Sequence, residues 1–371
     1  MRYYIIAGEA SGDLHGSNLI RALKVADPAA DVRCWGGDKM SAAGGNLVRH
    51  YRDLAFMGFI EVVRNLPAIL RNFRFAKKDI LAFSPDVLVL IDYPGFNLRM
   101  ASWAKKNVLR VAYYISPQVW AWKESRVKTI RRSVDRMLVI LPFEKAFYAR
   151  HNMSVDYVGH PLVEAVDAFR RNNPDISRQK IVAVLPGSRR QEISVNLPLM
   201  LPVASRFPGY RFVVAKAPGI PDSFYEELLA PFPGVEAVRD QTYHLLMKAE
   251  AALVTSGTAT LETALFGVPQ VVCYKGSPVS YWIAKKLLTI KYICLVNLIL
   301  DENVVAELIQ HEFDANNMER HLKALLYDEG RRSQILKRYA ALYELLAAGG
   351  DASCHAARII SALAASKETT N

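Results

Sequence analysis

The chain has 371 residues, of which 51% are hydrophobic and 22% are charged. At roughly 150 residues per domain this length suggests about two domains, and the composition excludes a disordered or fibrous protein. Lys and Arg number 47 and Asp and Glu 36, which gives a net charge of 47 − 36 = +11. A positive balance favours an anionic partner such as phosphate groups, nucleic acid or an acidic membrane surface.

The four cysteines are far apart in the sequence, with no C-x-x-C pair and no nearby set of histidine ligands. This spacing favours reduced thiols in a cytoplasmic protein over a disulfide framework or a zinc site, and we expect neither a metal nor a cofactor. The apolar stretch at residues 2–7 is too short for a signal sequence, and no apolar run approaches the ~18 to 20 residues of a membrane span. Any membrane contact is therefore expected to be peripheral.

Short apolar runs rich in Val, Ile and Tyr alternate with longer segments of helical period, the pattern of parallel sheets covered by helices on both faces. We predict one doubly wound α/β domain over residues 1–172 and another over 178–371, separated by the polar segment Arg170–Ser177. From Asn303 onward the pattern is helical. The predicted strands are Tyr3–Ala7, Val32–Trp35, Val87–Ile91, Val111–Ile115, Met137–Ile140 and Val155–Val158 in the first domain, and Ile181–Leu185, Phe212–Ala215, Val235–Ala237, Ala251–Thr255 and Gln270–Tyr274 in the second.

Two such domains in tandem are expected to form a cleft at the carboxyl ends of their strands, where ligands of these folds bind. G-x-G-x-x-G is absent after the first strand and G-x-x-x-x-G-K-[ST] is absent everywhere. Dinucleotide oxidoreductases and P-loop NTPases therefore lose their main support. Asp-x-Asp is absent too, so nothing supports a metal held on a diphosphate by that pair.

The first strand-to-helix turn carries the motif Gly8-Glu-Ala-Ser-Gly-Asp13. Ser11 and Asp13 suit helix caps, whereas no cap requires Glu9. The turn is therefore expected to be partly structural and partly a substrate site, with Glu9, Ser11 and Gly12 as the candidate contacts. His15, in the following helix, is a further candidate.

Asp92 closes a strand of the first domain, in Ile91-Asp-Tyr-Pro-Gly-Phe-Asn97. A carboxylate partly desolvated by Tyr93 and Phe96 suits a general base for a hydroxyl, and the alternative is a cap for a helix that starts near Asn97.

His160 ends the last strand of the domain, in Val158-Gly-His-Pro161. It is either a substrate contact or a hydrogen-bonded turn residue.

Leu185-Pro-Gly-Ser-Arg-Arg190 follows the first strand of the second domain, and we expect a helix to begin near Glu192. Gly187 lets backbone amides approach an oxyanion, Ser188 adds a hydroxyl donor, and Arg189 can fork onto phosphate oxygens. The alternative is an ordinary turn with exposed arginines.

A second turn of this kind is Thr255-Ser-Gly-Thr-Ala-Thr-Leu-Glu262. Ser256, Gly257 and Thr258 can donate to a diphosphate, and Glu262 can accept hydrogen bonds from a ribose diol. The alternative is an N-cap at Ser256 with Glu262 as a solvated helix residue. Two turns of this type in one domain favour the phosphate-binding interpretation.

Two further segments each have two interpretations. Tyr113–Lys123 contains four aromatic residues, which form either a sugar-stacking wall or part of the core. Between Phe56 and Phe83, apolar residues alternate with basic ones in a helical pattern. This surface either accommodates acyl chains or anionic lipid headgroups, or is a core-facing helix with a solvated basic face. Its basic residues are Arg64, Arg71, Arg74, Lys77 and Lys78.

Together these motifs closely resemble the lipid-A-disaccharide synthases, in order and over nearly the whole chain. The resemblance implies a GT-B glycosyltransferase with two Rossmann-like halves that face a cleft and a helical C-terminus. The donor would be UDP-2,3-diacylglucosamine and the acceptor 2,3-diacylglucosamine 1-phosphate (lipid X), giving the β-1,6-linked disaccharide 1-phosphate and UDP. The segments that carry it are Gly8–Asp13, Met57–Val62, Asp92–Asn97, Ser116–Lys123, Leu141–Glu144, Gly159–Pro161, Leu185–Arg189 and Ser256–Glu262.

The resemblance also implies residue roles. Gly95 stands where many members have a second acid, which leaves Asp92 as the sole candidate base, and Val296 and Ala306 stand where proline is more usual. The first half would bind the lipid acceptor. The implied contacts of the UDP half are Gly187, Ser188, Arg189, Ser256, Gly257, Thr258, Glu262 and Asn297, and Glu307 and Gln310 match a Glu-Leu-Leu-Gln segment near the same cleft.

The family works at the inner face of the cytoplasmic membrane of Gram-negative-type bacteria, so an anionic membrane surface is an expected partner. The final helices either return to the first domain or reach a partner chain, and a homodimer stays open. A UDP-sugar epimerase or a cell-wall N-acetylglucosaminyl transferase would share the nucleotide fold but needs no acylated donor. Nucleic acid is not expected, because no helix-turn-helix or single-strand stacking module is evident.

Overall fold

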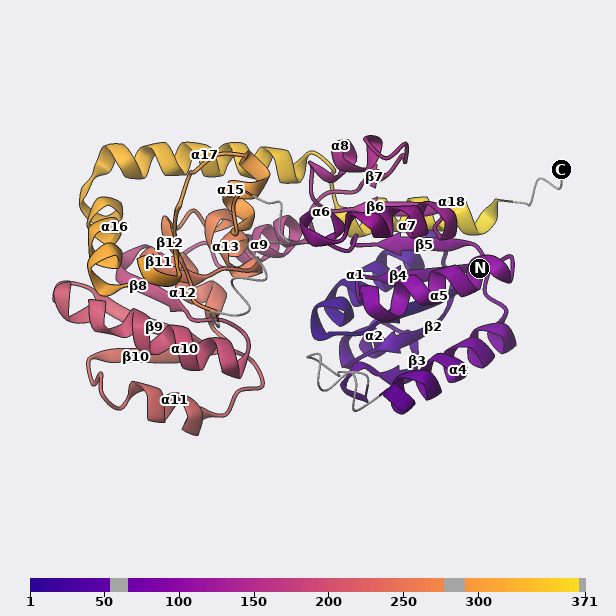
Figure 1. Ribbon diagram of the computed structural model, residues 1–371, viewed down its shortest axis with the longest axis horizontal. Coiled ribbons are helices and arrows are strands. Elements are labelled where there is room, and N and C mark those ends of the chain that lie inside the picture. Colours follow the sequence, from indigo (N-terminus) through magenta and orange to yellow (C-terminus); the bar gives the residue numbers. More distant parts are fainter. Residues whose placement is uncertain (54–65, 277–290, 367–371) are drawn as a thin grey trace. The chain divides into compact units, whose positions relative to one another are not determined.

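The computed structural model describes residues 1–53, 66–276 and 291–366 (Figure 1). Its contacts divide the chain into two compact units. The first unit is Met1–Pro161 with Leu346–Asn371, and the second is Leu162–Leu345. Each unit is built on one parallel sheet, as the alternation of apolar runs and helical segments predicts.

The first unit has a seven-stranded parallel sheet in the order β3-β2-β1-β4-β5-β6-β7. The strand order reverses between β1 and β4, the type of position at which parallel α/β sheets bind ligands. The strands are β1 Arg2–Ala7, β2 Asp31–Gly36, β3 Asn46–His50, β4 Val87–Ile91, β5 Val111–Tyr114, β6 Arg136–Val139 and β7 Asp156–Tyr157. The helices are α1 Ala10–Ala26, α2 Asp38–Ala42, η1 Tyr51–Asp53, α4 Leu66–Phe83, α5 Pro94–Lys106, α6 Val119–Trp122, η2 Glu124–Arg126, α7 Val127–Ser133, α8 Glu144–Ala149 and α18 Ala352–Ala365.

Neighbouring residues of the central strands enter two different cores. Tyr4 and Ile6 belong to the core that includes α4, α5 and α7, whereas Tyr3 and Ile5 belong to the core that includes α1 and α18. This alternation is the period of two of a strand, and both sets are apolar because both faces of the sheet are covered.

The last helix, α18, packs in the first unit, where Figure 1 shows it in yellow. Ala356 and Ile360 are fully buried in the core that includes α1, and the Tyr3 hydroxyl donates to Ser361 Oγ at 3.1 Å. The expected boundaries had placed this helix in the second domain. A helical period predicts an apolar face but not which sheet will cover it.

The second unit has a six-stranded parallel sheet in the order β10-β9-β8-β11-β12-β13, which reverses between β8 and β11. Two helices, α9 Pro161–Asn172 and α17 Glu329–Ala347, begin in one unit and end in the other. The strands are β8 Gln179–Leu185, β9 Arg211–Lys216, β10 Val235–Arg239, β11 Ala249–Thr255, β12 Gln270–Tyr274 and β13 Ala306–Ile309. The other helices are α10 Arg190–Met200, η3 Leu201–Arg206, α11 Asp222–Leu229, α12 Thr242–Lys248, α13 Thr258–Leu265, α15 Leu295–Leu300, η4 Gln310–Glu312 and α16 Ala315–Tyr327.

The prediction of helix from Asn303 onward is wrong at β13. Residues 306–309 pair in parallel with β12, with Glu307 opposite Val272 and Leu308 opposite Cys273. Ala, Glu and Leu are good helix formers, but pairing at the edge of a sheet overrides this weak local preference. Strand β3, also at a sheet edge, was not predicted.

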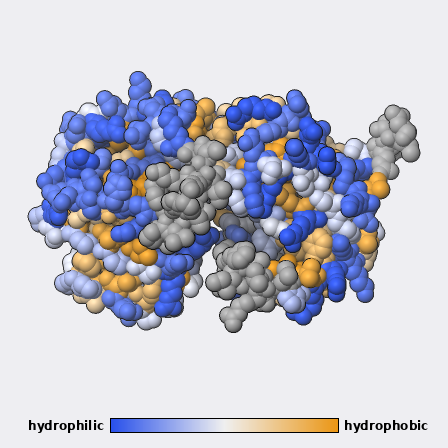
Figure 2. All heavy atoms as spheres, viewed as in Figure 1, coloured by the Kyte–Doolittle hydropathy of each residue, from blue (hydrophilic) through white to orange (hydrophobic). Residues whose placement is uncertain are grey.

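Two parts of the expected pattern fall outside the described residues: the segment Met57–Val62 and Arg64. Among the helices of the described ranges, none combines the length and the apolar character that crossing a membrane requires. Figure 2 shows hydrophobic atoms at the surface of the first unit around α4, next to strongly hydrophilic ones. Within α4, Leu70 and Leu81 are 48% and 50% exposed.

Candidate functional site

The backbone of Asp92 is held in an unusual conformation at the end of β4. Asp92 and Tyr93 both have left-handed angles, with φ of 42° and 50°. Such angles are costly for residues other than glycine and persist only where surrounding contacts impose them. The Asp92 carbonyl accepts hydrogen bonds from the Tyr113 hydroxyl at 2.6 Å and from Asn97 Nδ2 at 2.8 Å. These bonds fix the residue without using its carboxylate.

Asp92 is not the N-cap of the following helix, because α5 begins at Pro94 and its N-cap is Tyr93. The pKa of Asp92 is raised to about 6, chiefly by burial and further by the negative charge of Glu9, against an opposing hydrogen bond from Tyr93. A carboxyl group with a pKa near the working pH is well suited to accept a proton from a hydroxyl.

The turns after β1 and β4 lie side by side. Ala7 and Ile91, the last residues of the two strands, are Cα partners in the register. A Cβ on Gly8 would lie 2.4 Å from ring atoms of Tyr93, so only glycine lets the ring rest against the first turn. The structure therefore brings Glu9 and Asp92 together, as their electrostatic interaction also shows.

The rest of the Gly8–Asp13 motif is largely structural. Asp13 is 4% exposed and accepts hydrogen bonds from the backbone of Gly37 at 2.7 Å and Met40 at 3.0 Å, so it holds the start of α2 and not its own helix. Gly12 is buried, and a Cβ there would lie 3.1 Å from that of Ala7. Ser11 is exposed.

The buried His160 and the half-buried His15 lie close enough to interact electrostatically. Burial, together with the other histidine for His160 and Lys39 for His15, lowers the pKa of His160 to about 3 and that of His15 to about 4. Both rings are therefore neutral near pH 7. The His160 backbone N–H donates to Leu346 at 3.3 Å, and His15 Nδ1 has no hydrogen-bond partner within the described ranges.

The first phosphate-type turn of the second unit follows β8. Gly187 has a φ of 122°, and α10 begins at Arg190, two residues earlier than expected, with Arg189 as its N-cap. Glu192 lies over the turn. Its carboxylate accepts a hydrogen bond from Ser188 N–H at 3.3 Å and lies 3.5 Å from the Arg189 guanidinium. The chain's own carboxylate thus uses the donors that an oxyanion would use.

The second turn follows β11, the strand next to β8 in the sheet, where Val254 pairs with Leu185. Gly257 is the N-cap of α13, and Gly257 and Thr258 are both exposed. Among the described residues, no atom beyond the chain neighbours of Gly257 lies within 4 Å of its ideal Cβ position, which leaves space for a ligand. The Ser256 hydroxyl donates inward to the Ile293 carbonyl at 2.8 Å, so it anchors the turn.

Glu262 lies one turn into α13. Its carboxylate accepts a hydrogen bond from the Tyr243 hydroxyl at 3.0 Å, and burial raises its pKa despite this bond. Glu262 is therefore half-buried and hydrogen-bonded, and is not a freely solvated helix residue. Asn196, which the sequence analysis missed, links α10 to β11 through its bond to Thr255 Oγ1 at 3.3 Å.

Asn297 and Glu307 are parts of one buried network. The Glu307 carboxylate accepts hydrogen bonds from Ile293 N–H at 3.0 Å, Cys294 N–H at 3.1 Å and Asn297 Nδ2 at 3.0 Å. Asn297 also donates to the Val305 carbonyl at 2.9 Å, and its oxygen accepts two backbone N–H bonds. All four bonds that an amide side chain can make are thereby used. Through Ile293, this network also holds Ser256.

Gln310 follows the end of β13 with a φ of 56°. Its Nε2 atom is buried and has no hydrogen-bond partner in the part of the chain that the structure describes. A buried donor of this kind is costly unless something accepts its hydrogen bond. Gln310 is therefore suited to meet a ligand oxygen.

The aromatic segment Tyr113–Lys123 is divided between the core and the surface. Tyr113 and Tyr114 are fully buried in the core, whereas Trp122 is 49% exposed.

Glu144, from the Leu141–Glu144 motif, is 1% exposed and accepts a hydrogen bond from Leu141 N–H at 3.0 Å, and burial raises its pKa to about 7. The sequence motif marked Glu144 but gave no indication of its burial.

Comparisons with known proteins agree with this picture. A model of the family "Lipid-A-disaccharide synthetase" matches residues 3–362. A lipid-A-disaccharide synthase of Trichlorobacter lovleyi is 40% identical over 364 residues, which cover 94% of this chain and 94% of that protein.

Two solved structures share the fold over almost the whole length. The UDP-GlcNAc 2-epimerase of Neisseria meningitidis, bound to UDP-GlcNAc, has a TM-score of 0.65 at 12% identity and covers 98% of this chain and 99% of that one. The glycotransferase of kitacinnamycin has a TM-score of 0.65 at 14% identity, with 98% of each chain covered. The expected fold, two Rossmann-like units of GT-B type with a helical C-terminus, is confirmed.

Proposed function

The chain belongs to the lipid-A-disaccharide synthetase family, and on that premise we propose that it transfers diacylglucosamine from UDP to the 6-hydroxyl of diacylglucosamine 1-phosphate. The chain is a glycosyltransferase of lipid A biosynthesis. One observation carries the assignment of residues: each unit has its candidate turns on the two strands between which its sheet order reverses.

We assign the binding of the donor's diphosphate to the second unit. The amides and hydroxyls of Gly187, Ser188, Gly257 and Thr258 supply neutral donors, and Arg189 supplies the positive charge. The register of β8 and β11 supports this role, because it puts the two turns at the same edge of the sheet. Donors held in place before the reaction stabilise the charge that grows on the leaving diphosphate, usually the largest catalytic contribution.

Glu262 and Gln310 are assigned hydrogen bonds to the nucleotide or sugar of the donor. The Glu262 carboxylate is a hydrogen-bond acceptor oriented by the Tyr243 hydroxyl. The Gln310 Nε2 atom is a buried hydrogen-bond donor. Asn297 and Glu307 are assigned an indirect role, in which they hold the segment that anchors Ser256.

We assign the binding of the acceptor and the activation of its hydroxyl to the first unit. Asp92 removes the proton of the 6-hydroxyl as its oxygen forms a bond to the anomeric carbon and the bond from that carbon to UDP breaks with its electron pair. The displacement inverts the anomeric centre. The raised pKa of Asp92, about 6, supports this role, because the group is ionised at pH 7 yet close enough in pKa to accept the proton. Glu9, Ser11, Gly12 and His160 are assigned to the acceptor side of the reaction.

We also propose that the protein works peripherally at the inner, anionic face of the cytoplasmic membrane. The charge of +11 and the exposed leucines of α4 support this location, since basic and apolar side chains on one helix suit a lipid surface. A homodimer remains a second proposal.

The direct test incubates the protein with UDP-diacylglucosamine and diacylglucosamine 1-phosphate in the presence of a chelator, and looks for the disaccharide by mass. Product from the wild-type protein supports the proposal. An epimerase, the rival that shares the fold, would instead interconvert UDP-sugars without any acceptor. No disaccharide, or product that forms without the lipid acceptor, would overturn the proposed function.

A further inference from the structure

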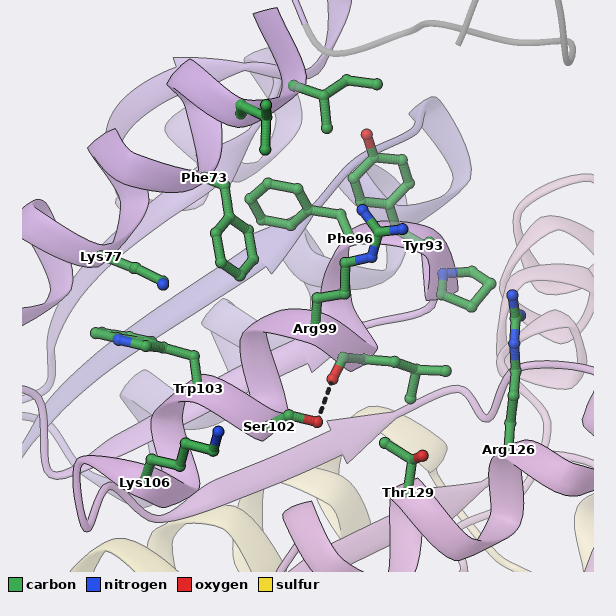
Figure 3. A pocket seen from close by; sticks show the side chains of 15 residues that line it. Phe73, Lys77, Tyr93, Phe96, Arg99, Ser102, Trp103, Lys106, Arg126 and Thr129 are labelled. Atoms are coloured by element: carbon green, nitrogen blue, oxygen red, sulfur yellow. Dashed lines mark hydrogen bonds between the residues drawn. The ribbon is translucent and has the colours of Figure 1, made fainter. Parts of the chain in front are cut away.

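A groove of about 860 Å³ opens between α4 and α5 in the first unit. Its walls are mainly apolar and aromatic. The rings of Phe73 and Phe96 meet edge to face at 5.4 Å between centroids, and Leu70 and Trp103 line the groove beside them (Figure 3). A groove of this size with apolar walls suits hydrocarbon chains.

The groove also carries positive charge. Lys77, Arg99, Lys106 and Arg126 line it, and none of its described lining residues is Asp or Glu. Lys77 Nζ lies 4.6 Å from the centroid of the Phe73 ring, so cation and aromatic wall are adjacent. A molecule that complements this surface is both apolar and anionic, as an acylated sugar phosphate is.

One side of the groove is continuous with the residue assigned as base. Tyr93, Pro94 and Gly95, which directly follow Asp92, line it. Figure 3 shows Tyr93 and Arg126 on one side, and Lys77, Trp103 and Lys106 on the other. The charge of Arg126 also acts on Tyr113, whose hydroxyl holds the Asp92 carbonyl at 2.6 Å. Arg126 therefore belongs to the side near the base.

We propose that this groove binds the lipid acceptor, with its acyl chains against Leu70, Phe73 and Trp103 and its phosphate at Arg126. The inference rests on the proposed function and adds to it a binding site for one of the two lipids. The acceptor is the favoured occupant because its hydroxyl must reach Asp92, and because the donor's phosphates are assigned to the second unit. The sugar ring would lie between Asp92 and Arg126.

The apolar part is tested with Leu70→Asp, and Leu81→Asp is the matched control. Both leucines lie on α4 with nearly equal exposure, 48% and 50%, but only Leu70 lines the groove. In detergent micelles, where no bilayer is present, Leu70→Asp should raise the KM for the long-chain acceptor at least about tenfold, and less for a short-chain acceptor. The KM for the donor should not change in either variant.

Three results would overturn this part of the proposal. Equal effects of Leu70→Asp and Leu81→Asp would point to the helix and not to the groove. A raised KM for the donor would make the donor the occupant. Loss of binding to phosphatidylglycerol vesicles in both variants, with the KM for the acceptor unchanged in Leu70→Asp, would make the surface a membrane contact only.

The anionic part is tested with Arg126→Gln, and Lys128→Gln, an exposed cation two residues further along, is the control. Loss of a charge-assisted bond to phosphate should lower kcat/KM about 10- to 100-fold with the phosphorylated acceptor. With an acceptor that lacks the 1-phosphate, Arg126→Gln and wild-type protein should be equally active. Equal losses with both acceptors would overturn the assignment of Arg126.

Failure of the groove proposal is distinguishable from failure of the proposed function. If the wild-type protein forms the disaccharide but Leu70→Asp and Arg126→Gln behave as their controls do, only the groove proposal fails. If the wild-type protein forms no disaccharide, the proposed function itself fails. UDP affinity, assigned to the second unit, should be the same in all four variants and reports that each is folded.

Discussion

Glu9 and Asp92 follow Ala7 and Ile91, which are partners in neighbouring parallel strands, and the negative charge of Glu9 helps to raise the pKa of Asp92 to about 6. Two carboxylates thus interact at the point where the order of the first sheet reverses. Perturbed pairs of this kind are typical of sites that transfer protons.

The first prediction concerns the pH dependence set by this pair. Asp92 accepts a proton only when ionised, so kcat/KM should fall as the pH drops through about 6. Glu9→Gln removes a negative charge and should lower the pKa of Asp92, which shifts this acidic limb to lower pH. The measurement is kcat/KM from pH 4.5 to 8, with Glu226→Gln, an exposed glutamate of the second unit, as control. An acidic limb that does not move would contradict the coupling.

The second prediction is that Asp92→Asn is less active but more stable. The folded-state pKa is raised from 3.8 to about 6, so the ionised group destabilises the fold above pH 6 and this penalty disappears as the pH falls. At about 1.4 kcal/mol per pKa unit, Asp92→Asn should raise the free energy of unfolding by up to roughly 3 kcal/mol at pH 8. Turnover should fall about 10²- to 10⁴-fold.

Urea unfolding at pH 8 and at pH 4.5 checks the stability of Asp92→Asn. The gain over the wild-type protein should be smaller at pH 4.5, where Asp92 is largely protonated in the folded state. Equal gains at both pH values would mean that the charge of Asp92 is not the cause. Near wild-type turnover would remove Asp92 as the base.

The third prediction separates two adjacent arginines. Arg189 is 64% exposed beside the first phosphate-type turn, whereas the Arg190 guanidinium lies over the Phe224 ring at 4.6 Å. Arg189→Ala should weaken UDP binding about 10- to 100-fold, the range for loss of a charge-assisted hydrogen bond. Arg190→Ala should leave it within about threefold. Isothermal titration with UDP measures both, and equal losses would indicate a general charge effect.

The fourth prediction is that Glu192→Gln tightens UDP binding. The Glu192 carboxylate accepts a hydrogen bond from Ser188 N–H and lies near Arg189, so it competes with the diphosphate for the same donors. An exposed pair of this kind contributes about 0 to 1 kcal/mol, so the gain should be at most about fivefold. Gln191→Ala, an exposed neighbour, is the control. Weaker binding in Glu192→Gln would instead give Glu192 a direct contact with the ligand.

The sequence predicted the strands that carry the site because their Val, Ile and Leu runs are buried on both faces. β4 and β12 have the predicted bounds, Val87–Ile91 and Gln270–Tyr274. Glycine turns directly after such strands predict candidate ligand contacts through the general rule for parallel sheets. The sequence alone therefore predicts Asp92, Arg189 and Gly257 as candidate site residues.

The sequence pattern does not predict which residues contact each other across long separations in the chain. Nothing local indicates that Asp13 holds α2, that α18 covers the first sheet, or that residues 306–309 join the second sheet as β13. Asn297 illustrates the same limit. The family resemblance implied that Asn297 contacts the ligand. Whether it contacts the ligand or supports the binding site depends on which atoms its amide already bonds.

The fifth prediction tests that supporting role at Glu307. Its carboxylate accepts three N–H bonds, from Ile293, Cys294 and Asn297. Glu307→Ala leaves these three donors without this acceptor, at about 1 to 3 kcal/mol each where water does not reach them, so the free energy of unfolding should fall by at least roughly 3 kcal/mol.

UDP affinity should fall with stability in Glu307→Ala, because the Ile293 carbonyl anchors the Ser256 hydroxyl of the second turn. Glu302→Ala, which removes a surface partner of Arg338, should cost about 1 kcal/mol or less and leave UDP binding unchanged. Thermal unfolding and UDP titration on the same samples separate the two possible roles. If Glu307→Ala loses UDP affinity at unchanged stability, Glu307 contacts the nucleotide directly; if both fall together, it holds the turn that does.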